Sequence, residues 1–191
     1  MSSQVSIAPR QVLNARQAET VDKVLHSGLE VLEEVGPEAL TIRMVAARAG
    51  VSPATAYTYF ASKNHLFAEI YLRHVMAHPA PAVEGAPVER LKAVVRHLAE
   101  TLLATDHLAV AANVALLASD TEVERLRLAI GSEFWRRFVT ALGPDVDQQV
   151  VYAVVFAFSG AILQAGMGML STESLLAHLD SVVELVAQGV S

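Results

Sequence analysis

The feature that most constrains this chain is a short turn sequence, Gly50-Val51-Ser52-Pro53, between two helical patterns. Glycine adopts left-handed backbone angles without strain and typically follows the last residue of a helix. Pro53 keeps Ser52 out of the helical region and itself fits a first helical position, so Ser52 can cap a new helix. The sequence therefore predicts one helix that ends before Gly50 and a second that begins at Pro53.

Further capping residues delimit the helices around this turn. Thr41 precedes apolar residues at helical spacing and predicts a helix through Ala49. The second helix is expected to span about 53–60, and Ser62 predicts a third helix that begins at Lys63. Two short helices joined by a tight glycine turn form a helix-turn-helix, whose second helix can lie in the major groove of DNA.

The stretch Thr41–Lys63, TIRMVAARAGVSPATAYTYFASK, resembles the tetracycline-repressor (TetR) family of bacterial one-component regulators. The positions that match the family pattern without a gap are Thr41, Val45, Ala46, Ala49, Gly50, Val51, Ser52, Thr55, Tyr57, Tyr59, Phe60, Ser62 and Lys63. Asn64-His65 departs from that pattern, because relatives usually carry an acid soon after the lysine, and this weakens the predicted cap of the third helix. The detailed resemblance covers about residues 20–75 and implies a homodimeric, ligand-responsive transcriptional regulator.

Charge is distributed unevenly along the 191 residues, whose formal net charge is −6. Residues 1–78 contain seven Lys/Arg and seven Asp/Glu, whereas residues 79–191 contain seven Lys/Arg and thirteen Asp/Glu. The stretch Thr41–Lys63 contains three basic residues and no acid. An acidic chain thus retains a region suited to the phosphates of double-stranded DNA.

Position and resemblance together predict DNA contacts for individual residues. We expect phosphate contacts from Thr41, Arg43, Tyr57, Tyr59 and Lys63, a groove-facing side formed by Ala54, Thr55 and Thr58, and Ser52 as the cap of the recognition helix. That helix has no Arg, Lys, Asn or Gln, so it lacks the bidentate base contacts that discriminate by about 1–3 kcal/mol. Readout is expected to use thymine-methyl contacts from Ala54 and Thr55, one or two hydroxyl bonds, Arg43 and DNA shape. Alternatively, Tyr57 is a core aromatic, as Phe60 is expected to be.

Helical spacing and helix breakers predict an all-α chain of about nine helices. Beyond the helix-turn-helix, helices are expected at 15–35 (stopped by Gly36-Pro37), 63–78, 88–104, 106–118, 121–142 (with a Thr121–Glu124 capping box), 145–170 (capped by Asp145) and 173–189. The predicted domains are a flexible arm (1–14), a DNA-binding domain (15–62), a linker helix (63–78) and a ligand-binding and dimerisation domain (79–191). Arg10 and Arg16 either touch DNA from the arm or belong to a disordered tail.

The stretch Val150–Leu170 is uncharged over 21 residues and is long enough to cross a bilayer. Against a membrane span, the nearest flanking charges are acidic, and Gln164 would lie in hydrocarbon. Small residues recur at every fourth position and allow close helix approach: Ala153, Ala157, Ala161 and Ala165. We therefore expect a buried helix at a homodimer interface, which with the last helix forms half of a four-helix bundle, as the resemblance implies.

Enzyme chemistry has no support in the sequence. The chain lacks cysteine, a nucleophile elbow, a phosphate-binding glycine loop and a His-Glu metal motif, so we expect no enzyme, no cofactor and no metal. His74 and His78 have the spacing of two metal ligands on one helix face, but no third ligand is evident. The first 20 residues lack the apolar core of a secretory signal, so we expect a cytoplasmic protein.

The second half of the chain is the expected ligand-binding region, because family members enclose a cavity there. A small apolar effector is expected, and the candidate lining residues are His97, Leu98, Leu102, Asn113, Leu117, Trp135, Phe138, Phe156, Gln164 and Met167, with His97 or Gln164 as polar groups that orient it. Two alternatives remain open: a helical protein-interaction module without specific DNA binding, and a membrane-associated bundle.

Overall fold

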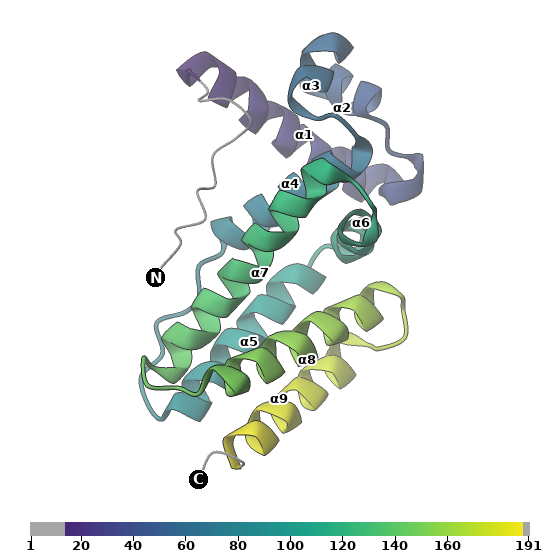
Figure 1. The fold of residues 1–191 in the computed structure, drawn as a ribbon. Coiled ribbons are helices and arrows are strands. Elements are labelled where there is room, and N and C mark those ends of the chain that lie inside the picture. Colours follow the sequence, from purple (N-terminus) through teal and green to yellow (C-terminus); the bar gives the residue numbers. More distant parts are fainter. Residues whose placement is uncertain (1–13, 189–191) are drawn as a thin grey trace.

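The computed structural model describes residues 14–188, apart from the side chains of Asp106 and Gln188, and within this range it contains nine helices and no strand. The all-α prediction is confirmed for these residues. The helices are α1 (Ala15–Ala39), α2 (Ile42–Arg48), α3 (Pro53–Tyr59), α4 (Lys63–Ala77), α5 (Pro87–Leu103), α6 (Asp106–Leu117), α7 (Thr121–Leu142), α8 (Gln148–Gly166) and α9 (Thr172–Gln188). Figure 1 shows α1–α3 gathered at one end and α5, α7, α8 and α9 stacked at the other.

The first helix continues past its predicted stop. Gly36 has a φ of 75° and kinks the chain there, but Pro37 suits the start of a new helical turn, so α1 resumes and ends at Ala39. At its start, Asn14 and Gln17 form a capping box with two hydrogen bonds of 2.9 Å. The predicted arm lies, apart from Asn14, outside the described residues.

The boundaries of α7 and α8 correct the sequence prediction. α7 is capped by Asp120, whose Oδ1 accepts from the Glu122 N–H at 3.0 Å, in place of the predicted Thr121–Glu124 box. α8 begins at Gln148 behind an Asp147 cap, not behind Asp145. A shorter aspartate reaches the N–H two residues ahead, so the cap lies immediately before each helix.

α8 also ends four residues before the predicted Leu170, because Gly168 takes a left-handed φ of 73°. Two backbone bonds close this end, from Met169 N–H to Gln164 O at 3.0 Å and from Gly168 N–H to Ala165 O at 2.9 Å. This pattern is a Schellman motif, which a positive-φ glycine makes possible.

A continuous apolar core joins the N-terminal helices to the rest of the chain. α4 packs against α6 and α7, and α6 also packs against α1. Phe60 and Phe67 belong to the same buried cluster as Leu98 and Phe138. The two predicted domains therefore share a core, and the division at residues 62 and 78 stays a prediction.

α8 is covered on only one face of the single chain. Val151, Val154, Phe158 and Ile162 are buried, whereas Ala153 is exposed and the other three alanines of the predicted stripe are half-buried. By length and composition α8 could cross a membrane, and 22% of its most apolar window is buried in the structure. The complete burial that the sequence suggests is therefore not supplied by the chain itself.

Candidate nucleic-acid interface

The turn between α2 and α3 has the geometry that its glycine predicts. Gly50 has a φ of 68°, the Val51 N–H donates to Ala46 O at 3.0 Å, and the Gly50 N–H donates to Ala47 O at 3.2 Å. These two bonds form a Schellman motif that satisfies the last carbonyls of α2. The turn therefore fixes the angle at which α3 leaves α2.

The three predicted caps are present. Thr41 Oγ1 accepts from the Met44 N–H at 3.3 Å, and Ser52 and Ser62 Oγ accept from the N–H groups three residues ahead, each at 3.0 Å. The expected weakening at His65 is offset, because its Nδ1 accepts from the Ala61 N–H at 3.3 Å. The imidazole thus takes the place of the family's acid, and α2, α3 and α4 all start at side-chain caps.

One side of α3 packs inward and the opposite side is open. Ala56 and the following Phe60 are buried, which confirms Phe60 as a core residue. Ala54, Tyr57 and Thr58 are exposed, and Thr55 and Tyr59 are half-buried. Tyr57, with 48% of its surface exposed, is not a core aromatic. The predicted groove-facing residues therefore lie on or beside the accessible side of this helix.

The hydroxyl groups of α3 already have partners. Ser52 Oγ and Thr55 Oγ1 are 2.8 Å apart and share one proton, with either as donor. Thr58 Oγ1 donates to Ala54 O at 2.9 Å. These bonds hold the side chains in single rotamers before any DNA arrives.

The three basic residues of this region have different surroundings. Arg48 forms a two-bond fork with Glu34 at 2.7 and 2.6 Å, and this lowers the pKa of the Glu34 carboxyl. Lys63 Nζ donates to Pro37 O and Glu38 O at 2.9 and 3.1 Å, which ties the start of α4 to the end of α1. Arg43 is exposed and has no bond or ion pair with another described residue. Arg43 is therefore the basic group most available to a phosphate.

α7 holds the start of the linker helix. Ser62 Oγ donates to Asp120 Oδ2 at 2.5 Å. This bond outweighs the effect of burial and lowers the pKa of the Asp120 carboxyl. Sequence reasoning assigned no contact to Asp120, because its partner is distant in the sequence.

α7 also holds the end of the linker helix. Arg137 donates to Val75 O at 2.6 Å, to His78 O at 2.9 Å and to Glu133 Oε1 at 2.7 Å. Burial raises the pKa of Glu133, but hydrogen bonds from Arg136 and Arg137 outweigh it, so this pKa lies below its usual value. The sequence showed only two more charges on an amphipathic helix, so this anchor was missed.

The candidate effector residues fall into separate groups. Leu98, Leu102 and Phe138 are buried in the core, and Trp135 is half-buried. Leu117, Phe156, Gln164 and Met167 are exposed, and half-buried Asn113 donates to Leu163 O. His97 is half-buried, and its Nε2 lies beneath the surface with no hydrogen-bond partner in the described structure. The ten residues do not enclose one space in this conformation, and their role stays a prediction.

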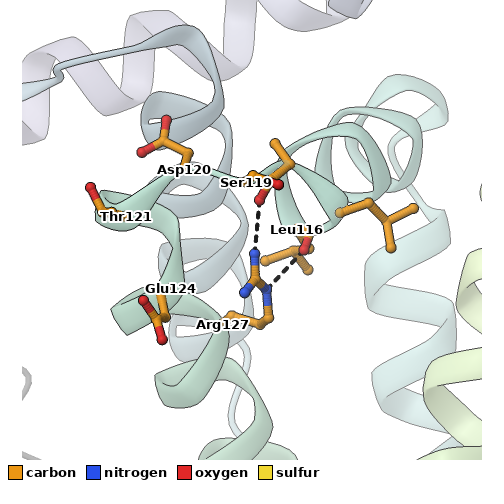
Figure 2. A pocket seen from close by; sticks show the side chains of 8 residues that line it. Leu116, Ser119, Asp120, Thr121, Glu124 and Arg127 are labelled. Carbon is orange, nitrogen blue, oxygen red and sulfur yellow. Dashed lines mark hydrogen bonds between the residues drawn. The ribbon is translucent and has the colours of Figure 1, made fainter.

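An open pocket of about 570 Å³ lies at the α6–α7 turn (Figure 2). Its lining comprises Leu116, Leu117, Ala118, Ser119, Asp120, Thr121, Glu124 and Arg127, so Leu117 is the one predicted effector residue in it. Arg127 donates to Leu116 O at 2.8 Å and to Ala118 O at 3.0 Å, which completes the C-terminus of α6. The pocket's main polar group is thus already occupied by the chain.

The histidine pair of α4 is engaged with the backbone. The rings of His74 and His78 are 4.5 Å apart, with His74 Nε2 3.1 Å from Thr101 O and His78 Nδ1 2.8 Å from His74 O. Burial lowers the pKa of His74. Among the described residues, no three His, Cys, Asp or Glu side chains form a group that could hold a metal.

Comparison with known proteins identifies the family. Residues 24–70 match the profile described as bacterial regulatory proteins, tetR family. An HTH-type transcriptional regulator of Mycobacterium tuberculosis is 41% identical over 181 residues, which cover 93% of this chain and 85% of the relative. The HTH-type transcriptional repressor KstR of the same species is 29% identical over 158 residues, 78% of this chain and 71% of its own length.

The fold has solved counterparts. The crystal structure of a TetR transcriptional regulator from Rhodococcus sp. RHA1 covers 93% of this chain and 100% of its own, with a TM-score of 0.80 at 20% identity. Together with the capped helix-turn-helix, these matches show that the chain belongs to the tetR family of bacterial regulatory proteins and is a DNA-binding transcriptional regulator, not an enzyme.

Proposed function

We propose that this chain is a homodimeric repressor that binds a near-palindromic operator and is released by a small effector. The observation that carries the proposal is the pre-ordered, outward face of α3, whose Ala54, Tyr57 and Thr58 are exposed and whose start is capped by Ser52. Two such faces would enter successive major grooves about one helical turn apart. The similarity to the repressor KstR supports repression as the sign of regulation.

The exposed face of α8 supports pairing with a second copy. The ring centroids of Trp135 and Tyr152 are 4.6 Å apart, and those of Tyr152 and Phe156 are 5.9 Å apart, so an aromatic row leads onto this face. Phe156 is 69% exposed in the single chain. Contact between two copies of α8 would remove this apolar surface from water without a membrane, in keeping with a cytoplasmic regulator.

The effector is proposed to act between α5 and the helices packed on it. His97 supports this location, because a buried imidazole nitrogen without a partner costs free energy that a bound hydrogen-bonding group would recover. The proposed effector is therefore mainly apolar with one polar group. Its binding would displace α4 and change the separation of the two recognition helices, which requires a different effector affinity for the two arrangements.

The first experiment measures DNA binding by gel shift as a function of salt, using duplexes from the DNA that flanks the chain's own gene. We expect a specific complex whose affinity falls with salt. Arg43→Gln should lower the slope of log K against log salt by about one, as expected for one lost phosphate contact. Arg48→Gln is the matched control, because its charge is already paired with Glu34, and it should leave the slope unchanged.

A specific complex that is absent at all salt concentrations would instead favour the protein-interaction module. Equal slope changes for the two arginine variants would mean that pairing with Glu34 does not keep Arg48 from DNA. In that case the assignment of Arg43 as the principal phosphate contact would be wrong.

The second experiment measures oligomeric state by sedimentation. Phe156→Glu places a charge on the exposed face of α8 and should shift the dimer toward monomer. Leu128→Glu changes a residue of α7 that is 62% exposed and should leave the dimer intact. A wild-type chain that is monomeric, or that pellets with lipid vesicles, would exclude the proposed role of α8.

A further inference from the structure

The crest of the recognition helix consists of two residues. Successive residues of an α-helix are rotated by about 100°, so Ala54 and Thr58, each two positions from Ala56, lie almost opposite it. Ala56 is fully buried, whereas Ala54 and Thr58 are exposed. Any base edge that α3 approaches head-on therefore meets a methyl group from Ala54 and the side chain of Thr58.

The hydroxyl of Thr58 is wired in one direction. A threonine hydroxyl has one proton to donate and two lone pairs to accept with. The single proton of Thr58 is used on Ala54 O, at an Oγ1–O distance of 2.9 Å. Toward solvent, Thr58 therefore presents an acceptor and a methyl group, and the internal bond fixes which side each occupies.

Its neighbour Thr55 differs in this respect. Thr55 Oγ1 pairs with Ser52 Oγ at 2.8 Å, and either oxygen can be the donor, so this pair can present a donor or an acceptor to a ligand. Thr55 is also half-buried. Thr58 alone combines an outward position with a fixed hydrogen-bonding sense.

We propose that Thr58 determines operator specificity by accepting a hydrogen bond from the exocyclic amine of adenine or cytosine. In the major groove these amines, adenine N6 and cytosine N4, are the base donors, whereas guanine and thymine present acceptors at the corresponding edge. An acceptor-only hydroxyl is satisfied by the former and opposed by the latter. This inference rests on the proposed function, since it requires α3 to lie in the major groove.

The test begins with selection of bound sequences from a pool of random duplexes by the full-length protein. In the selected operator, each adenine is then replaced by purine and each cytosine by 2-pyrimidinone, which removes one exocyclic amine at a time. Amine removal at one base pair of each half-site should weaken wild-type binding by roughly two- to tenfold, the range for one neutral hydrogen bond.

Two variants separate the acceptor from the methyl group. Thr58→Val keeps the shape but lacks the oxygen, so it should bind the unmodified operator two- to tenfold more weakly and show no further loss when that amine is removed. Thr58→Ser keeps the oxygen and should remain sensitive to the amine. Thr140→Val is the matched control, because Thr140 makes the same bond to Arg136 O, at 2.8 Å, on α7, and it should bind like the wild type.

The outcomes separate this inference from the function on which it rests. A wild type that selects an operator but is insensitive to every amine removal, or a Thr58→Val variant that stays as sensitive as the wild type, overturns the role of Thr58 and leaves the regulator intact. A wild type that enriches no sequence overturns the proposed function, and the role of Thr58 with it.

Discussion

Replacement of Arg137 by methionine tests the anchor that joins the linker helix to α7. Arg137 is 3% exposed and Glu133 is 8% exposed, so the pair is withdrawn from water. The variant would remove the charge partner of Glu133 and would leave Val75 O and His78 O without their donor. Methionine is similar in length to the arginine stem, so the loss of packing is small.

The structure sets the size of the effect. Removal of one member of a buried ion pair costs about 3–5 kcal/mol, because the remaining charge is left without compensation. Here Arg136 would still bind Glu133 through two bonds of 2.8 and 2.6 Å, which places the expected loss at the lower end, about 3 kcal/mol. For a chain of this size, this corresponds to a decrease in Tm of roughly 6–12 °C.

Urea and thermal unfolding followed by circular dichroism measure this loss, with Arg136→Met as the control. Arg136 binds the same carboxylate, but its side chain is 63% exposed, so its removal should cost at most about 1 kcal/mol. If the two variants are equally stable, burial does not govern the strength of these contacts, and the anchor cannot hold α4 as described.

The remaining predictions concern packing and pH. Gly166→Ala would place its Cβ 2.2 Å from Asn113 Nδ2, so it should destabilise the chain by about 1–3 kcal/mol in urea unfolding, whereas Gly131→Ala meets no atom within 4 Å inside α7 and should stabilise it by about 0.5–1 kcal/mol. Because the folded pKa of Asp120 is lowered, its bond with Ser62 contributes stability above the unfolded pKa of about 3.9, and this is lost as pH falls through the folded value. The difference in unfolding free energy between the wild type and Asp120→Asn should therefore shrink below about pH 4; a constant difference would contradict this assignment.

Local turn chemistry explains which parts of the fold were predictable. The helix ends near Gly50 and the caps at Thr41, Ser52 and Ser62 depend on residues within five positions of each other, and the structure contains all of them. Gly36 also breaks the helix as predicted, but the sequence does not reveal that Pro37 restarts it. The sequence is thus most informative where the bonded groups are close along the chain.

Contacts between distant positions were not predictable. Arg48 appeared to be a free base in an acid-free stretch, yet folding brings Glu34 of α1 to it, 14 residues away. Lys63 likewise meets carbonyls 25 and 26 residues away. A hydrophobic pattern fixes which face of a helix is buried but not which neighbour its charged side chains reach. The predicted basic surface is therefore reduced, among its three bases, to Arg43 as the group without an internal partner.

The linker helix is held to α7 at both of its ends, and this limits how an effector can move it. Ser62 is bonded to Asp120, and Val75 and His78 to Arg137, so α4 and α7 run in the same direction and are fixed in register. Displacement of α4 alone would break these bonds, each with a net value of about 1 kcal/mol or more. Displacement of both helices together preserves them.

A signal in the C-terminal helices therefore reaches α3 most readily by displacing α7 relative to α5 or α8, with α4 carried along. Hydrogen exchange in the presence and absence of operator DNA can measure this coupling. If α4 and α7 form one unit, their backbone amides should gain protection together, and Arg137→Met should restrict the gain in α7 to its N-terminal half, where Asp120 still binds Ser62. Protection that appears in wild-type α4 without any change in α7 would show that the linker helix moves alone.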